Sequence, residues 1–198
     1  MIIGLDLDNT IVSYENAIVK IADEFTEIPN HIAKNKDKIK GFFIENNLEK
    51  KWTFYQGELY GPGMKYAKPY PGVIDFIKQV LVRDHKICII SHRSKKPYGG
   101  QDYNLHIIAR NWINMHLPYQ ESNQKFSIYI LETLEKKIEM IKTLKCDVFL
   151  DDLIQVLDHP NFPKNTARFL FNGTNSSLNK NITQANSWNH FSELIGPI

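Results

Sequence analysis

The chain has 198 residues, of which 42% are hydrophobic and 23% are charged, and its formal net charge at pH 7 is +2. That length suits one main domain with a real hydrophobic core, and the composition is ordinary for a globular protein. So small a net charge does not indicate a nucleic-acid polymer or a membrane surface as partner. Because no stretch approaches the length of a membrane span and the N-terminus lacks a basic leader, we expect a cytoplasmic protein.

The first predicted strand, "MIIGLDL", carries two carboxylates near its end, Asp6 and Asp8. Side chains alternate between the faces of a strand, so both carboxylates lie on one side of the chain. Two like charges this close repel each other. They are tolerated where a metal, a cation or a shared proton offsets the repulsion, or where the strand has already ended and both groups are in water. Both interpretations stay open on this stretch alone.

The segment from residue 14 to 68 predicts helices around 14–27, 31–47 and 49–60, before "GPGMKYAKPYPG" turns the chain back. We interpret it as an inserted helical subdomain that serves either as a lid or as plain packing. The same two possibilities apply to its aromatic residues, which suit a small core of their own or stacking on a base or a sugar. These residues are Trp52, Phe54, Tyr55, Tyr60 and Tyr66.

The rest of the chain alternates short apolar runs with segments of helical periodicity. The runs "KICIIS", "FSIYIL", "CDVFLDD" and "ARFLF" suit buried strands, and helices are predicted over 72–83, 102–115, 135–145 and 188–195. The polar segment 172–187 predicts a long loop. This alternation indicates a Rossmann-like three-layer α/β/α sandwich with a parallel sheet. We assign residues 1–13 and 69–198 to that core and 14–68 to the helical insertion.

Both cysteines, Cys88 and Cys146, fall within predicted strands. Buried cysteines outside an oxidising compartment behave as small hydrophobic residues. We therefore expect structural thiols, and the fold does not require a disulfide.

Three predicted strands end in groups that could bind a ligand. Asp6, Asp8 and Thr10 follow the first strand, Ser91 ends the second, and Asp151 and Asp152 end a later one. The carboxyl ends of parallel strands lie along one edge of a sheet, so these side chains should converge in one crevice. Carboxylate oxygens suit a hard cation such as Mg²⁺, and the chain has no His or Cys cluster with zinc spacing.

The predicted helix "LEKKIEMIKTL" carries a candidate partner for these acids. Lys137 interrupts an apolar stripe formed by Leu134, Ile141 and Leu144 at helical spacing, whereas Lys136 falls off that stripe. Either the Lys137 ammonium group is directed along the buried face toward the acids, or the side chain reaches out to solvent.

Four motifs together resemble those of the haloacid-dehalogenase-like (HAD) superfamily: "DLDNT", Ser91, Lys137 and "LDD", in this order. The resemblance covers residues 1 to about 158, and the insertion after the first strand is similar to the helical cap of that superfamily. Asp8, two residues after Asp6, resembles the phosphatase and phosphotransferase branches rather than the dehalogenases.

The resemblance implies a Mg²⁺-dependent phosphatase in which Asp6 attacks phosphorus and forms an aspartyl phosphate. Asp8 then binds Mg²⁺ through its backbone carbonyl and serves as general acid and base. Thr10 supports the loop, Ser91 binds phosphoryl oxygens, and Lys137 stabilises their charge. The resemblance favours Asp152 as the direct metal ligand, with Asp151 orienting a water molecule or Lys137.

His92 and Arg93 follow Ser91 and are assigned to the substrate phosphate, although capping the loop or pairing with an acid explains them equally well. The expected partner is a small phosphorylated metabolite, and the oligomeric state stays open. Trp188 resembles a tryptophan of the 5′-deoxyribonucleotidases, so a nucleotidase-like specificity is one alternative. The others are a phosphotransferase or phosphomutase and a sensor of phosphorylated metabolites without turnover.

Overall fold

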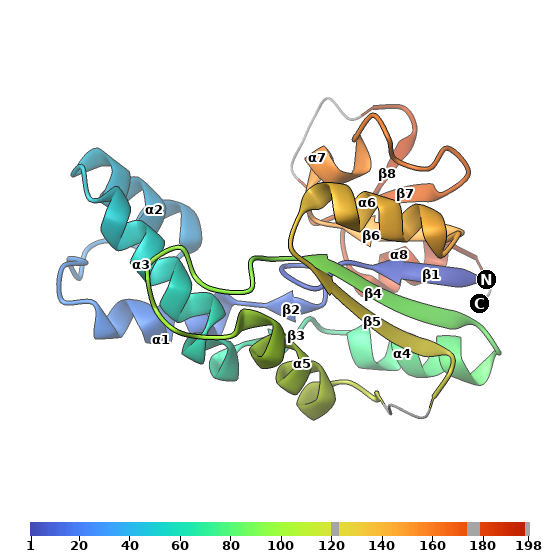
Figure 1. Ribbon diagram of the computed structural model, residues 1–198, viewed down its shortest axis with the longest axis horizontal. Helices are drawn as coiled ribbons and strands as arrows, with labels where there is room; N and C mark the ends of the chain where they lie inside the picture. The colour runs from blue at the N-terminus through green and yellow to red at the C-terminus, as the bar shows by residue number, and fades with distance from the viewer. Residues whose placement is uncertain (120–122, 174–178, 197–198) are drawn as a thin grey trace. The chain divides into compact units, whose positions relative to one another are not determined.

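The computed structural model describes residues 1–119, 123–173 and 179–196, which form two compact units (Figure 1). The core unit comprises residues 1–12, 69–93 and 116–198, and the insertion unit comprises residues 13–68 and 94–115. Among the described residues, no helix combines the length and the apolarity that crossing a bilayer requires.

The core unit is built on a parallel sheet of six strands in the order β5-β4-β1-β6-β7-β8. These strands are β1 (Ile2–Leu5), β4 (Lys86–His92), β5 (Phe126–Leu131), β6 (Val148–Asp151), β7 (Ala167–Phe171) and β8 (Ile182–Ala185). A separate pair, β2 (Val12–Ser13) and β3 (Lys68–Pro69), forms a two-stranded sheet. The parallel α/β architecture agrees with the prediction from the alternating apolar and helical segments.

β1 lies between β4 and β6, and Gly4 pairs with Cys88 on one side and Phe149 on the other. A Cβ atom added at Gly4 would lie 2.4 Å from Cδ2 of Phe149. Only glycine therefore fits at this point without moving the Phe149 ring.

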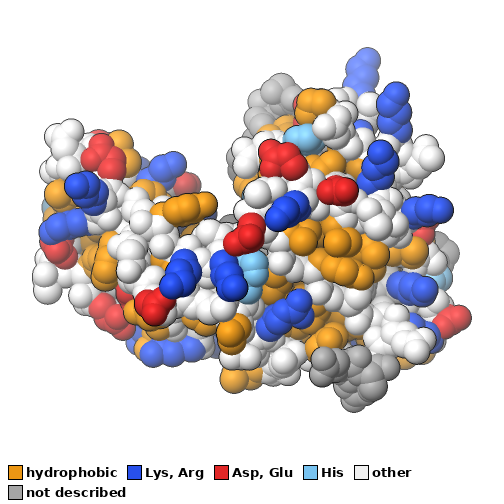
Figure 2. Space-filling view, in the orientation of Figure 1, with side chains coloured by type: hydrophobic (Ala, Val, Ile, Leu, Met, Phe, Trp, Pro, Cys, Tyr) orange, Lys and Arg blue, Asp and Glu red, His pale blue; other side chains and the backbone are white. Residues whose placement is uncertain are grey.

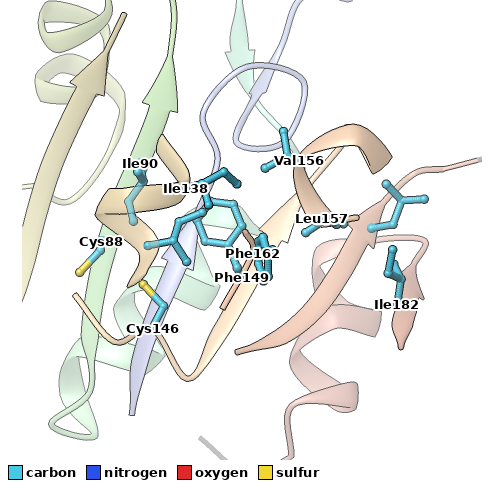
Figure 3. Close-up of a cluster of buried hydrophobic side chains, with 11 residues drawn as sticks. Cys88, Ile90, Ile138, Cys146, Phe149, Val156, Leu157, Phe162 and Ile182 are labelled. Atoms are coloured by element: carbon cyan, nitrogen blue, oxygen red, sulfur yellow. The ribbon is translucent and has the colours of Figure 1, made fainter. Parts of the chain in front are cut away.

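Helices cover both faces of this sheet: α4 (Val73–Val82), α6 (Leu134–Thr143), α7 (Ile154–Leu157) and α8 (Trp188–Leu194). Against one face, Ile138 and Ile141 of α6 and Val156 of α7 pack on Phe149 (Figure 3). Cys88 and Cys146 belong to the same apolar cluster, and both are buried free thiols. Burial raises the pKa of the Cys146 thiol to about 12, so the thiol is protonated at neutral pH.

The other face of the sheet carries an aromatic cluster. Phe76 of α4 and Phe191 of α8 both contact the Trp188 ring, and Phe171 of β7 packs against it as well. The Trp188 indole is 1% exposed, and its Nε1–H donates a hydrogen bond of 3.1 Å to the backbone carbonyl of Thr10. Trp188 therefore connects α8 to the turn that follows β1.

The insertion unit contains α1 (Glu15–Glu24), α2 (Lys36–Glu45), α3 (Glu49–Tyr60), the 3₁₀ helix η1 (Pro62–Tyr66) and almost all of α5 (Leu105–His116). It has its own aromatic core, in which Trp52 and Tyr55 stack and Phe43 packs against both. Phe54 is the exception, with 43% of its surface exposed. Packing therefore accounts for Trp52 and Tyr55.

Two features differ from the sequence-based prediction. Residues 94–115, assigned to the core, cluster with the helical insertion. Strand β8 falls inside the predicted loop 172–187, of which residues 174–178 lie outside the described residues. The sequence "ITQA" contains no apolar run, because this edge strand buries only Ile182 and Ala185.

Candidate active site

The candidate site lies entirely within the core unit, at the carboxyl ends of three adjacent strands. Asp6 follows β1 directly, Ser91 and His92 end β4, and Asp151 ends β6. Because β1 lies between β4 and β6, these side chains share one edge of the sheet. Neighbouring strands thus bring together residues that are far apart in the sequence.

Lys137 projects into this edge from the first turn of α6, whose N-terminus is capped by the Thr133 hydroxyl accepting from the Lys136 N–H. Its Nζ lies 2.6 Å from Oδ1 of Asp6 and 2.7 Å from Oδ2 of Asp151, and the side chain is 0% exposed. Burial alone would lower the pKa of Lys137, but the charges of Asp151 and Asp6 outweigh it and raise the pKa. Lys137 is therefore a buried cation between two buried acids.

Asp151 and Asp152 are adjacent in sequence but have different environments. Both oxygens of Asp151 are engaged, because Oδ2 contacts Lys137 and Oδ1 accepts a hydrogen bond of 2.9 Å from the Leu153 N–H. Asp152 makes no hydrogen bond or ion pair with any described residue. Burial raises its pKa to about 8, and the charges of Asp6 and Asp151 add to the rise. Asp152 is thus the acid with free ligand atoms.

Asp6, Asp151 and Asp152 each offer a carboxylate oxygen, and these three atoms lie within 4.8 Å of one another. Burial raises the pKa of Asp6 to about 7; Lys137 opposes this rise, and Asp151 and Asp8 add to it. Hard divalent cations bind such clusters of carboxylate oxygens, and a cation would remove the mutual repulsion. The donor set therefore fits Mg²⁺.

A tight turn after β1 positions Thr10. Ile11 and Val12 both donate backbone hydrogen bonds to the Leu7 carbonyl, and Asn9 adopts a left-handed conformation with φ of 58°. The buried hydroxyls of Thr10 and Ser91 have no hydrogen-bond partner among the described residues, nor has Nδ1 of His92. Buried polar atoms without a partner are costly, so these three groups are available to a polar ligand or to water.

The Arg93 guanidinium, assigned from the sequence to a substrate phosphate, contacts the Asp8 carboxylate in the structure. Nε donates to Oδ2 over 3.2 Å, and Nη2 donates to Oδ1. For His92, burial and the nearby Lys137 charge lower the pKa of the imidazole, which is therefore neutral at pH 7. The structure thus brings all nine predicted site residues to one edge, but Arg93 contacts a carboxylate of the site itself.

Besides the pairing of Arg93 with Asp8, sequence reasoning missed two further contacts at this site. The Leu153 N–H reaches Asp151 because the chain turns immediately after β6, and backbone groups leave no signal in the sequence. The Trp188 indole reaches Thr10 from the other end of the chain. A tryptophan at this position predicts a buried side chain, but the sequence does not show which group accepts its hydrogen bond.

No protein-family model matches the sequence, and no match was found among curated proteins. Solved structures do match the fold. Protein tyrosine kinase A of Mycobacterium tuberculosis aligns over 98% of this chain and 97% of its own, with a TM-score of 0.65 and 12% identity. A putative phosphoglycolate phosphatase from Lactobacillus delbrueckii covers 99% and 98%, with a TM-score of 0.59 and 10% identity. A HAD phosphatase from Thermococcus onnurineus covers 98% and 97%, with a TM-score of 0.54 and 14% identity. The chain therefore has the fold of the HAD superfamily.

Proposed function

We propose that this protein is a Mg²⁺-dependent phosphatase that hydrolyses a small phosphate monoester through an aspartyl phosphate on Asp6. The observation that carries this proposal is the Lys137 ammonium group bound to both Asp6 and Asp151 in a fully buried site. The fold supports it, since two of the similar structures are described as phosphatases. Fold alone does not decide, because another similar structure is described as a tyrosine kinase.

Asp6 is the proposed nucleophile. Lys137 holds Oδ1 of its carboxylate, so Oδ2 is the oxygen that would attack phosphorus. A carboxylate needs no separate base, and covalent catalysis divides one difficult displacement into two easier ones. As Asp6 bonds to phosphorus, the ester bond to the alcohol oxygen breaks, and Asp8, which enters this step protonated, gives its proton to the departing oxygen and becomes a carboxylate.

The second step returns the enzyme to its starting state. Water attacks phosphorus and gives its proton to Asp8, the bond between phosphorus and Asp6 breaks, and inorganic phosphate leaves. Lys137 stabilises the charge on Asp6 in both steps. The unpartnered hydroxyls of Thr10 and Ser91 and the neutral His92 imidazole are the groups assigned to the phosphoryl oxygens.

The residues proposed to bind Mg²⁺ are Asp6, Asp152 and the backbone carbonyl of Asp8. Asp152 is preferred to Asp151 because its oxygens are free, whereas those of Asp151 bind Lys137 and the Leu153 N–H. When bound, Mg²⁺ neutralises phosphoryl charge and holds the reacting oxygens in place. Asp151 keeps Lys137 pointed at Asp6.

The test is phosphate release from a panel of sugar phosphates, nucleotides, polyol phosphates and 4-nitrophenyl phosphate, with and without Mg²⁺. We expect release that requires Mg²⁺ and falls at least about 1,000-fold in Asp6→Asn, because that variant lacks the nucleophile. The preferred panel member then identifies the substrate class. Retention of near-normal turnover by Asp6→Asn would exclude the covalent mechanism. Release only when an alcohol acceptor is added would indicate a phosphotransferase.

A further inference from the structure

Arg93 grips the Asp8 carboxylate with two adjacent nitrogens of its guanidinium group. Nε donates to Oδ2 and Nη2 donates to Oδ1, so the guanidinium group binds both carboxylate oxygens at once. The pair is largely enclosed, with 7% of the Arg93 side chain and 21% of the Asp8 side chain exposed. Enclosed bidentate pairs of this kind fix orientation as well as charge, unlike exposed single-contact pairs.

The two partners reach this contact from two neighbouring segments of the core unit, each with a paired backbone. Arg93 follows β4 directly, and its N–H donates a hydrogen bond of 2.8 Å to the carbonyl of Leu131 on β5. Its guanidinium therefore extends from a strand end anchored in the sheet. Asp8 lies in the turn after β1, where its backbone forms an isolated bridge with Val12. The two-point contact thus fixes the orientation of the Asp8 carboxylate relative to the guanidinium group.

We propose that Arg93 is a positioning residue that holds the Asp8 carboxylate in the orientation needed for proton transfer, rather than a ligand of the substrate phosphate. This inference rests on the proposed function, in which Asp8 protonates the leaving alcohol oxygen and later accepts the proton of the attacking water. Asp6 and Asp151 are held by Lys137. Arg93 provides the corresponding restraint for Asp8, the carboxylate that Lys137 does not contact in the described structure.

If Arg93 acts through Asp8, its removal produces a different kinetic pattern from the removal of a phosphate ligand. A misplaced proton donor slows departure of an alkyl alcohol, which needs the proton, far more than departure of 4-nitrophenolate, which leaves as a stable anion. The ratio kcat/KM reports on the steps from substrate binding up to release of the leaving alcohol. A lost phosphate ligand would instead slow both esters alike, raise KM and weaken competitive inhibition by inorganic phosphate.

The experiment is a kinetic double-mutant cycle of Arg93→Ala and Asp8→Asn on every ester that the wild type cleaves. Arg93→Ala should reduce kcat/KM about 10- to 100-fold for an alkyl phosphate, and severalfold less for 4-nitrophenyl phosphate. The double variant should be no slower than Asp8→Asn, because both substitutions impair the same proton transfer by Asp8. The inhibition constant of inorganic phosphate should stay within about twofold of the wild-type value in Arg93→Ala.

Two further variants complete the design. Arg93→Lys keeps the charge without the planar fork and should show an intermediate loss, and it carries the test if Arg93→Ala does not fold. Arg83→Ala removes an exposed arginine of the same unit, outside the site, and should match the wild type.

Multiplicative losses in the double variant, or equal losses on both esters with weaker phosphate inhibition, would overturn the positioning role and leave the phosphatase intact. A wild type that cleaves no ester would overturn the proposed function, and the role of Arg93 with it.

Discussion

Lys137 is a buried cation that stabilises the fold only because it is paired with Asp6 and Asp151. Removing an ammonium group and two carboxylates from water is costly, and the cost is offset because Nζ contacts both acids within 2.7 Å. The Phe149 ring adds a further contact, with Nζ 5.5 Å from its centroid. Taking away the cation would leave Asp6 and Asp151 buried, close together and uncompensated.

We predict that Lys137→Met lowers the free energy of unfolding by about 3–5 kcal/mol at pH 7 and abolishes phosphate release. Urea denaturation measures the first effect and a phosphate assay the second. Lys136→Met is the matched control: its side chain is exposed, so both quantities should stay near those of the wild type. A silent Lys137→Met beside an inactive Lys136→Met would mean that the structure assigns the wrong lysine.

The sequence could predict part of this site residue by residue. The stripe of Leu134, Ile141 and Leu144 indicated which face of the helix carries Lys137, because helical spacing determines direction. Strand order explains why Asp6 and Asp151 meet. The pairing of Arg93 with Asp8 could not be predicted, because it depends on side-chain torsion angles and on a contact 85 residues apart.

At the scale of elements, apolar runs predicted five strands, among which the inner strands β4 and β6 are buried over most of their length. β8 was missed because only Ile182 and Ala185 at its two ends are buried, and the four-residue helix α7 is too short to show a helical period. The more consequential element is α8, which follows β8 and carries Trp188 to the turn holding Thr10. A terminal helix thereby supports the opposite end of the chain.

We predict that Trp188→Phe lowers the free energy of unfolding by about 1–3 kcal/mol, because the buried Thr10 carbonyl loses its hydrogen bond. It should also reduce the rate of phosphate release, since the turn beside Asp8 loosens. Trp112→Phe is a close control: its indole is also buried and donates over 3.1 Å to a backbone carbonyl, that of Ala67 in the insertion unit. Equal effects of both variants on stability and on rate would argue against a specific role for Trp188.

At the scale of the whole molecule, the division into two units follows contacts that periodicity does not report. The amphipathic pattern of α5 predicts a buried face without saying what covers it. In the structure, the Trp112 indole donates a hydrogen bond to the Ala67 carbonyl. The Gln101 amide and the Tyr103 hydroxyl both donate to the carboxylate of Glu58 on α3. On the face viewed in Figure 2, basic and acidic side chains are interspersed, in keeping with the small net charge.

We predict that Mg²⁺ stabilises the protein more as pH rises from about 6 to 9. The pKa values of Asp6, about 7, and Asp152, about 8, lie above the ordinary value of 3.8. Binding requires both carboxylates to be ionised, so it releases protons at lower pH and becomes tighter as they are lost. The shift in thermal midpoint with Mg²⁺ should grow accordingly.

Asp152→Asn serves as the control, because it removes a ligand without breaking any contact among the described residues. It should retain the midpoint of the metal-free wild type at pH 7 and lose most of the Mg²⁺ shift. A Mg²⁺ shift that is the same at pH 6 and pH 9 would contradict the raised pKa values. A larger loss of that shift in Asp151→Asn would reverse the ranking of the two ligands.

The central place of β1 in the sheet has a consequence for the order of folding. Ile2 pairs with Lys86, and Ile3 pairs with Val148, so β1 is translated before both of its neighbours and cannot be completed on both sides until β6 has been translated. Until then its apolar edge depends on chaperones or on transient collapse for protection. Asp6 and Lys137 can meet only after α6 has been translated. A nascent chain stopped before β6 should therefore carry Asp6 without a working site.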